Sequence, residues 1–382
     1  MNNGQAMTLA WPAPFQDWQN IFTQPSWNSC LNYIKALCSE MRSFSVLGFT
    51  DLLNLSYDKH DHFISRAVWN ERQFNRYRVA ADIRHLGKKK LNVILDDSST
   101  RKFTNNPYFV GRGYIGNLGK VDRCLSGVFT CFTDGDEVFP VEVDLYLPAS
   151  KLTAGKQDHE FRSKIEIALS LLNRASFLAQ ELEIDVLYYI FDMWYASNRI
   201  FNLLHEGGVH YFTEIRPNRV LVQGKERISL KSFVTAHMLN PVFVDYREKE
   251  YKIWSAVARL DGVTHPVKIF MARFKVKGKE ETHFWVTNDL TLTEEGAVEL
   301  HCMRWRIDYF FREAKAYLAL DEGKFQKMRC YLRHFYLTFA GWSAIRMLIR
   351  LKCLQRLDKR KHLKTVQTTF QVVRLIRKKQ NE

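Results

Sequence analysis

The sequence lacks an apolar run long enough to cross a membrane. Its longest run, at residues 335–344, is about half of the ~20 residues that a membrane-spanning helix needs. The first 20 residues lack the basic start and apolar stretch of a secretory signal peptide, and they contain Pro12, Pro14 and Asp17. We therefore expect a cytoplasmic protein with no membrane partner.

The sequence also lacks paired cysteines. Seven cysteines are present, an odd number, and no two of them have the two-residue spacing of a zinc motif. A zinc site or a disulfide framework is therefore not expected, and the cysteines are predicted to be reduced thiols. No internal repeat or low-complexity tract is evident, which excludes solenoid and fibrous architectures.

Acidic residues are too few to balance the basic ones. Lys and Arg number 56 against 41 Asp and Glu, a formal net charge of +15, which predicts binding to a polyanion such as nucleic acid or an anionic membrane surface. Residues 346–382 hold 12 Lys and Arg against Asp358 and Glu382, a local charge of +10. This basic tail favours DNA, although a solvated helix, RNA or anionic lipid would also suit it.

Residues 1–90 are expected to form a helical domain. Apolar residues recur at helical spacing in 27–41 and in 62–79, and no strand-like alternation is found. The second stretch places arginines beside two aromatic residues, which predicts a small DNA-binding domain: Arg66, Arg72, Arg76, Arg78, Trp69 and Phe74. An ordinary amphipathic helix with a solvated basic face is the alternative.

The next segment, residues 91–208, is expected to begin an α/β core. The apolar run from Leu91 ends in two carboxylates, and strands are predicted at 125–133 and 138–147 with a turn between them. A long helix is predicted at 162–182 and a further strand at 185–192. Strand, hairpin, helix and strand is the element order of an RNase H-like fold.

The remaining chain divides into three predicted parts. Residues 209–292 have strand character, with basic turns between the strands, and are interpreted as a mostly β insertion. Helical periodicity resumes at 293–345, which is predicted to complete the RNase H-like core. Residues 346–382 form the basic helical tail.

Two aspartates stand where predicted strands end. Asp97 closes the first strand and Asp192 the fourth, so both carboxylates are expected at one edge of the sheet. Taken singly, each could equally serve as a helix cap or turn former. Two carboxylates at one edge favour a functional site.

A third group of charged residues lies on the predicted helix at 301–315. At about 100° per residue, Arg304, Asp308 and Lys315 fall within about 40° of one another, beside an apolar stripe. Ordinary ion pairs between neighbouring turns are the alternative. Glu313 lies about 140° from Asp308 and is expected to be solvated rather than part of a site.

Four motifs together resemble the insertion-sequence DDE transposases over roughly residues 45–350. They are Asp-Asp-Ser-Ser at 96–99, Gly-Asn-Leu-Gly-Lys-Val at 116–121, Phe-Asp-Met-Trp-Tyr at 191–195 and Arg-Trp-Arg-Ile-Asp-Tyr-Phe-Phe-Arg-Glu-Ala-Lys at 304–315. The resemblance matches Asp97 and Asp192 to the catalytic aspartates of the family. Arg304 and Lys315 match the arginine and lysine of its signature, whereas His301 replaces the signature tyrosine and Asp308 the glutamate.

The resemblance implies a transposase that binds double-stranded DNA, both at the ends of a mobile DNA element and at the target. It also implies association with the nucleoid and a homodimer when bound to DNA. It implies in-line attack on phosphodiesters, with two Mg²⁺ or Mn²⁺ ions bound by Asp97, Asp192 and Asp308. The residues implied to contact phosphate are Arg304, Lys315, Lys120 and Arg312.

Three questions stay open at the level of sequence. Because Asp308 is one methylene shorter than glutamate, a transposase-derived DNA-binding protein that does not cut is an alternative. An RNase H-like nuclease acting on branched or hybrid nucleic acid is another. Trp194 and Trp285 would suit either stacking on unpaired bases or a place in the core.

Overall fold

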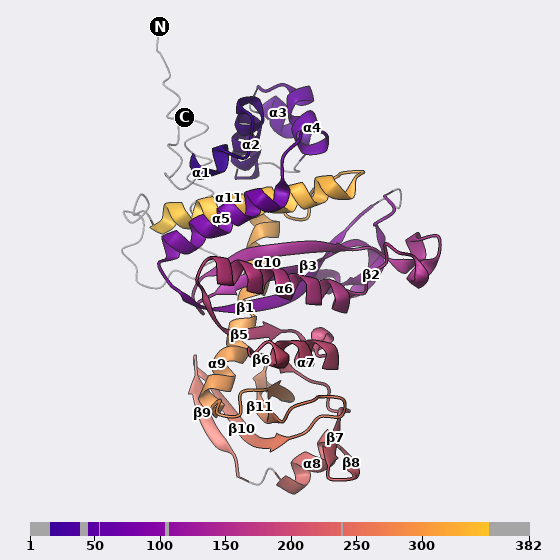
Figure 1. Cartoon of the computed structure of the whole chain (residues 1–382), viewed down its shortest axis with the longest axis vertical. Helices are drawn as coiled ribbons and strands as arrows, with labels where there is room; N and C mark the ends of the chain where they lie inside the picture. The colour runs from indigo at the N-terminus through magenta and orange to yellow at the C-terminus, as the bar shows by residue number, and fades with distance from the viewer. Residues whose placement is uncertain (1–15, 39–44, 53, 104–106, 238–239, 351–382) are drawn as a thin grey trace. The chain divides into compact units, whose positions relative to one another are not determined.

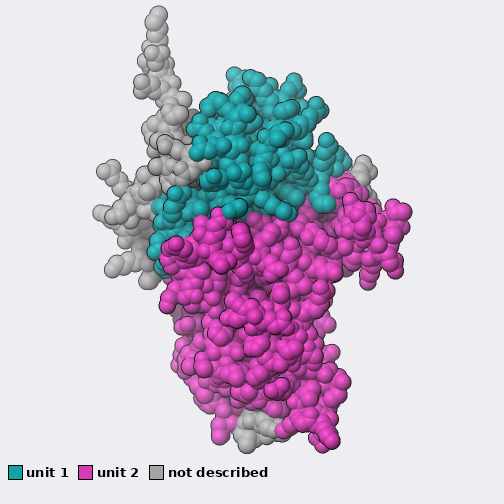
Figure 2. Space-filling model, in the orientation of Figure 1, with its two compact units in different colours: residues 1–88, 311–382 teal, residues 89–310 magenta. Residues whose placement is uncertain are grey.

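The computed structural model describes residues 16–38, 45–52, 54–103, 107–237 and 240–350. The chain divides into two compact units, residues 1–88 with 311–382 (unit 1) and residues 89–310 (unit 2), which are coloured separately in Figure 2. Over the residues described, no helix is both long and apolar enough to cross a membrane.

Unit 1 is helical, as the sequence predicts for its amino-terminal part. Its longest helix, α11 (Met328–Arg350), packs against three of the amino-terminal helices and supplies much of the buried core. A cluster of aromatic rings from Phe22, Phe63, Trp69 and Phe74 fills the space beside it. The other helices of this unit are α1 (Gln16–Gln19), α2 (Gln24–Leu37), α3 (Val46–Leu52), α4 (Tyr57–Ser65) and α5 (Glu71–Leu86).

The predicted helix at 62–79 is two helices. Asn70 ends the gap between α4 and α5, because its side chain accepts a hydrogen bond from the backbone N–H of Gln73 at 2.9 Å and so caps α5. The interpretation of its arginines as a basic face is partly wrong, since Arg78 is fully buried and forms an ion pair with Asp82 at 2.7 Å. Trp69 and Phe74 are also buried, so they belong to the core and not to a DNA-binding surface.

Arg333 of α11 ties this helix to the segment around α4. Its buried guanidinium donates hydrogen bonds to the carbonyls of Phe63 and Ile64, each at 3.1 Å, and to that of Ala67 at 2.6 Å. It also donates to Glu71 Oε1 at 2.7 Å. These bonds satisfy carbonyls at the end of α4 that the helix leaves without partners.

Unit 2 is built on one large mixed sheet (Figure 1). Three strands, β1 (Lys90–Arg101), β3 (Lys120–Thr133) and β4 (Val138–Tyr146), pair antiparallel in the order β4-β3-β1. Two more, β5 (Asp185–Phe191) and β6 (His210–Glu214), then follow parallel to β1. This arrangement confirms the predicted RNase H-like core.

The β-rich region continues the same sheet instead of forming a separate one. β12 (Lys279–Thr287) pairs antiparallel with β6, and the sheet then extends through β11 (Val267–Val276), β10 (Lys249–Ala258) and β9 (Val242–Tyr246). Since β6 pairs with β5, it belongs to the core, although its residues were predicted to begin the insertion. Four strands had no clear signal in the sequence: β9, β2 (Gly111–Ile115), which pairs with β3, and the small hairpin of β7 (Val220–Gln223) and β8 (Glu226–Ser229).

Four helices of unit 2 join or cover these strands. α6 (Lys164–Glu181) begins at a capping box formed by Ser163 and Glu166 and packs on β3, β4 and β5, as expected for the helix predicted at 162–182. α7 (Asn198–Glu206) connects the parallel strands β5 and β6, and α9 packs on the sheet beyond β6. The remaining bounds are α8 (Leu230–His237), α9 (Glu294–Arg304) and the short 3₁₀ turns η2 (Gly116–Leu118), η3 (Ala149–Lys151), η4 (Gly155–Gln157) and η5 (Met193–Tyr195).

The compact units differ from the predicted domain plan at one boundary. The plan placed all of 293–345 in the RNase H-like core, but residues from 311 onward group with unit 1. The boundary falls within α10 (Arg306–Tyr317). The difference has a physical cause, because α11 is buried against other helices rather than on the sheet. Residues 351–382 of the predicted basic tail lie outside the described residues.

Candidate active site

The pairing of two parallel strands brings two aspartates together. In the register of β1 and β5, Leu95 lies beside Phe191, so the next residues along the strands, Asp96 and Asp192, are neighbours. The pairing stops there, but β1 continues to Arg101 along its other neighbour, β3. The two carboxylates therefore stand where β1 and β5 separate.

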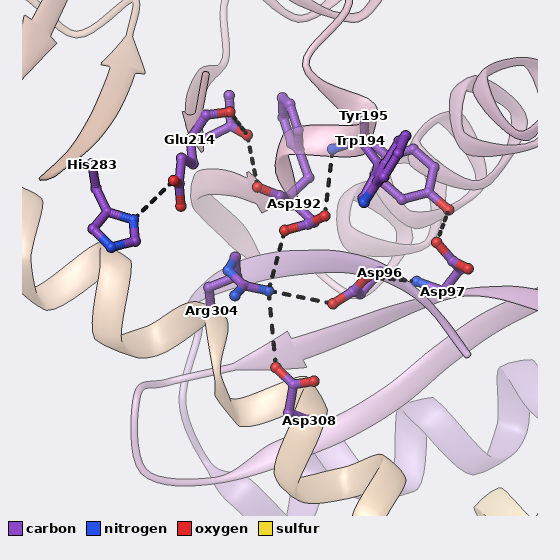
Figure 3. Close-up of polar contacts among 11 residues, drawn as sticks. Asp96, Asp97, Asp192, Trp194, Tyr195, Glu214, His283, Arg304 and Asp308 are labelled. Atoms are coloured by element: carbon purple, nitrogen blue, oxygen red, sulfur yellow. Dashed lines mark hydrogen bonds and ion pairs between the residues drawn. The ribbon is translucent and has the colours of Figure 1, made fainter. Parts of the chain in front are cut away.

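A third aspartate and an arginine complete a cluster (Figure 3). The Arg304 Nη1 atom lies 3.4 Å from Asp96 Oδ2, 3.7 Å from Asp192 Oδ1 and 3.9 Å from Asp308 Oδ2. One guanidinium nitrogen is thus surrounded by three carboxylates from β1, from the turn after β5 and from α10. We call these four residues the acidic cluster.

Asp97 has other partners, so the cluster contains Asp96 at the place where Asp97 was predicted. The Asp97 carboxylate accepts a hydrogen bond from Tyr195 Oη at 3.1 Å and forms an ion pair with Lys164 Nζ at 2.7 Å. Successive side chains of a strand point to opposite faces, so only one of the two adjacent aspartates can face Arg304. The register with β5 selects Asp96.

Burial shapes the electrostatics around Asp96. Desolvation raises the pKa of Asp96 well above its usual value, and the charges of Asp308, Asp192 and Asp97 raise it further, against the lowering effect of Arg304. Burial, with the adjacent charge of Asp97, also raises the pKa of Tyr195, which keeps that phenol protonated as a hydrogen-bond donor. The concentration of negative charge calls for a cation at this place.

The helical segment that carries Arg304 and Asp308 is interrupted between them. α9 ends at Arg304, Trp305 is a one-residue break, and α10 begins at Arg306, so the helix that was predicted as continuous is interrupted here. The Arg304 guanidinium carbon lies 4.3 Å above the centre of the Trp305 ring, which helps to orient it. The Asp308 side chain is 45% exposed, although its Oδ2 atom, which faces Arg304, is buried.

His301, which replaces the signature tyrosine of the family, lies in an aromatic stack. Its ring is stacked on Trp285 with a centroid distance of 4.5 Å. Burial lowers the pKa of His301 to about 3, with a smaller contribution from the charge of Arg304. The imidazole is therefore neutral at physiological pH, and Trp285 is a core residue with no exposed surface.

The donor set of the acidic cluster suits a hard cation. Three carboxylates supply only oxygen ligands, which Mg²⁺ and Mn²⁺ prefer. Across the described ranges, no three His, Cys, Asp or Glu side chains are grouped closely enough to form a ready metal site. The three carboxylates are nevertheless suitable ligands for Mg²⁺ or Mn²⁺, and in the structure the guanidinium of Arg304 lies among them.

The other predicted phosphate contacts are distributed along the chain. Lys120 is exposed at the start of β3. It lies nine positions before Phe129, the residue of β3 that pairs with Asp96, and this corresponds to roughly 30 Å along the strand. Arg312 is exposed and Lys315 half-buried on the part of α10 that belongs to unit 1. Two of the predicted phosphate contacts, Arg304 and Lys120, belong to unit 2, and Arg304 is the one that lies in the acidic cluster.

Glu313 is buried, so the expectation that it is solvated is wrong. Its side chain has no exposed surface, and its carboxylate accepts a hydrogen bond from Arg346 at 3.2 Å. The angular estimate placed it correctly away from Asp308, but that face of α10 is covered by α11 and not by water.

Sequence reasoning missed several residues around the cluster. Lys164 and Tyr195 hold Asp97, and they line a pocket of about 410 Å³ together with Trp194. Glu214 ends β6 and contacts His283 at 2.9 Å, which raises the pKa of that histidine. Phe191 pairs with Thr213, so the next residues along the two strands, Asp192 and Glu214, are neighbours. This register of β5 with β6 is the signal that could have indicated Glu214.

Comparison with known proteins places the chain among DNA-cleaving enzymes. Residues 19–238 match the family described as DDE superfamily endonuclease. Residues 147–352 match the family described as archaeal putative transposase ISC1217. The chain is also 25% identical, over 157 residues, to the probable transposase for insertion sequence element IS701 of Microchaete diplosiphon. That similarity covers 41% of this chain and 40% of the relative.

Proposed function

The chain belongs to the DDE superfamily of endonucleases, and from this premise we propose that it cuts DNA at the ends of an insertion sequence and joins them to target DNA. The observation that carries the proposal is the meeting of Asp96, Asp192 and Asp308 around Arg304. Carboxylates from two adjacent strand ends and a helix are the ligand set that two-metal phosphoryl transfer needs.

Each residue of the acidic cluster has a role in this proposal. Asp96, Asp192 and Asp308 would hold two divalent ions, Mg²⁺ or Mn²⁺. When bound, such ions activate the attacking oxygen and stabilise the leaving oxygen of an in-line displacement. Arg304 balances the carboxylates in the free protein, and in this proposal it would bind a phosphate oxygen of the DNA through its planar guanidinium.

The remaining parts of the proposal concern the DNA. Lys315, Arg312 and Lys120 would contact phosphates of the DNA. The net charge of +15 favours binding to the duplex in general. We propose that the protein acts as a homodimer on DNA, since an element has two ends. The DNA-binding protein that does not cut, and the nuclease that does not join, are the alternatives that the following experiment separates.

A plasmid that carries the DNA flanking the coding region tests this function directly. Incubated with the full-length protein and Mg²⁺ or Mn²⁺, it should be cut at discrete sites, and the released fragment should join to a second plasmid. Joining distinguishes a transposase from a nuclease. DNA binding without any metal-dependent cutting would overturn the proposal in favour of a protein that only binds.

The role of Arg304 predicts a change in metal-dependent stability. In Arg304→Gln the three carboxylates lose their counter-charge, so the free protein should melt at a lower temperature, and Mn²⁺ should raise its melting temperature more than that of the wild type. Arg306→Gln is the matched control, because Arg306 lies nearby on α10 but pairs with Asp136 outside the cluster. Equal Mn²⁺ shifts in the wild type and Arg304→Gln would contradict the assignment.

A further inference from the structure

Trp194 is held beside the acidic cluster with most of its surface exposed. It lies in η5, two residues after Asp192, and its backbone N–H donates a hydrogen bond to Asp192 Oδ2 at 3.4 Å. The side chain is 70% exposed, whereas Trp285, the other tryptophan singled out in the sequence, is fully buried. A large aromatic ring left in solvent next to a catalytic carboxylate calls for an explanation.

A basic pocket of about 450 Å³ lies beside this ring. The Arg216 guanidinium carbon is 4.9 Å from the centre of the Trp194 ring. Arg219 is held in the wall by hydrogen bonds to Asn198 Oδ1, at 3.1 Å, and to a backbone carbonyl. Arg199 completes a set of three arginines, and none of the residues that line the pocket is acidic. We call this the Trp194 pocket.

We propose that the Trp194 pocket binds an unpaired nucleotide of the DNA next to the phosphate that is cut. An exposed indole offers a stacking surface to any base, and the arginines offer charge to its phosphates. A base inside a duplex already has both faces covered by its neighbours, so only an unpaired one can stack on Trp194. The pocket volume is within the ~300–1,000 Å³ usual for pockets that take small ligands.

The position of the pocket connects it with the cutting site. Trp194 lines both the Trp194 pocket and the pocket that contains Asp97 and Lys164, so the ring stands between two hollows close to Asp192. A nucleotide held there would fix the DNA strand relative to the acidic cluster. This inference rests on the proposed function, because it assumes that DNA is the substrate.

The test uses a DNA duplex whose single-stranded overhang contains the fluorescent base 2-aminopurine, and a blunt duplex of the same sequence. Titrations with the full-length protein are made in EDTA, so that nothing is cut. Stacking on the indole should quench the fluorescence of the overhang. Trp194→Ala should abolish the quenching and weaken binding of the overhang about 5- to 150-fold, with little change for the blunt duplex. Trp194→Phe should retain most of the binding.

Phe243→Ala provides the matched control. Phe243 is also an exposed aromatic residue beside a basic side chain, Lys252, but it lies on β9 at the far edge of the sheet from β2. The Phe243→Ala variant should bind both duplexes as the wild type does. Unchanged quenching in Trp194→Ala, or an equal loss for the two duplexes, would overturn the nucleotide pocket while leaving the proposed function intact. Failure of the wild type to bind either duplex would overturn both.

Discussion

Asp96→Asn should lower the rate of DNA cleavage by about 10³-fold or more, while DNA binding is retained. Asp96 is a buried carboxylate of the acidic cluster, and losing a metal ligand removes transition-state stabilisation of several kcal/mol, on the order of 4 kcal/mol for 10³-fold. The basic surface that attracts phosphates is unchanged by the substitution. Cleavage would be measured on the plasmid described above, and binding by electrophoretic mobility shift.

Asp97→Asn is the matched control for this prediction, since the same change is made one residue away. Asp97 faces Lys164 and Tyr195, not Arg304, so its loss should lower the rate by about tenfold at most, through the position of the turn that carries Tyr195. A folded Asp97→Asn protein that is as inactive as Asp96→Asn would show that the register between β1 and β5 does not determine the catalytic residue.

Arg333→Met should destabilise unit 1 by about 3–5 kcal/mol. The buried guanidinium donates hydrogen bonds to three backbone carbonyls and to Glu71, so its removal takes a donor from each of these buried carbonyls and leaves Glu71 paired with Arg329. The residue also packs 4.6 Å from the centre of the Trp69 ring. Urea unfolding followed by circular dichroism would measure the loss, because unit 1 is helical.

Arg329→Met tests whether burial is the cause. Arg329 donates a hydrogen bond to the same Glu71 oxygen, at 2.5 Å, but its side chain is 57% exposed, so its loss should cost no more than about 1 kcal/mol. Similar unfolding curves for the two variants would contradict the view that the buried hydrogen bonds of Arg333 hold α11 to the segment after α4.

The order of secondary-structure elements could be predicted from the sequence because the core strands are strongly apolar. The strands that became β1, β3 and β4 contain continuous buried runs, β5 is apolar and buried at its end, and α6 begins at a clear capping box. These signals are local. The strands β7, β8 and β9 are only four or five residues long, and β8 and β9 are mostly exposed, so they carry no such pattern and could not be recognised.

The candidate site was harder to predict because it depends on pairing between distant segments. The Asp-Asp dipeptide indicates a strand end, but the choice between Asp96 and Asp97 follows from the alignment of β1 with β5. The spacing of Arg304 and Asp308 predicted that the two side chains are neighbours, and the structure brings them together at 3.9 Å. Their assignment to a catalytic site came from the family resemblance and not from the spacing. The burial of Glu313 could not be read from its own helix, since the covering helix α11 lies elsewhere in the sequence.

Binding of Mn²⁺ to the protein–DNA complex, followed by electron paramagnetic resonance, tests the central claim most directly. The account predicts that the wild type and Asp97→Asn bind Mn²⁺ alike, whereas Asp96→Asn, Asp192→Asn and Asp308→Asn each bind it at least ~10-fold more weakly, because each loses one of three carboxylate ligands. Unweakened binding in all three variants would show that the acidic cluster is not the metal site.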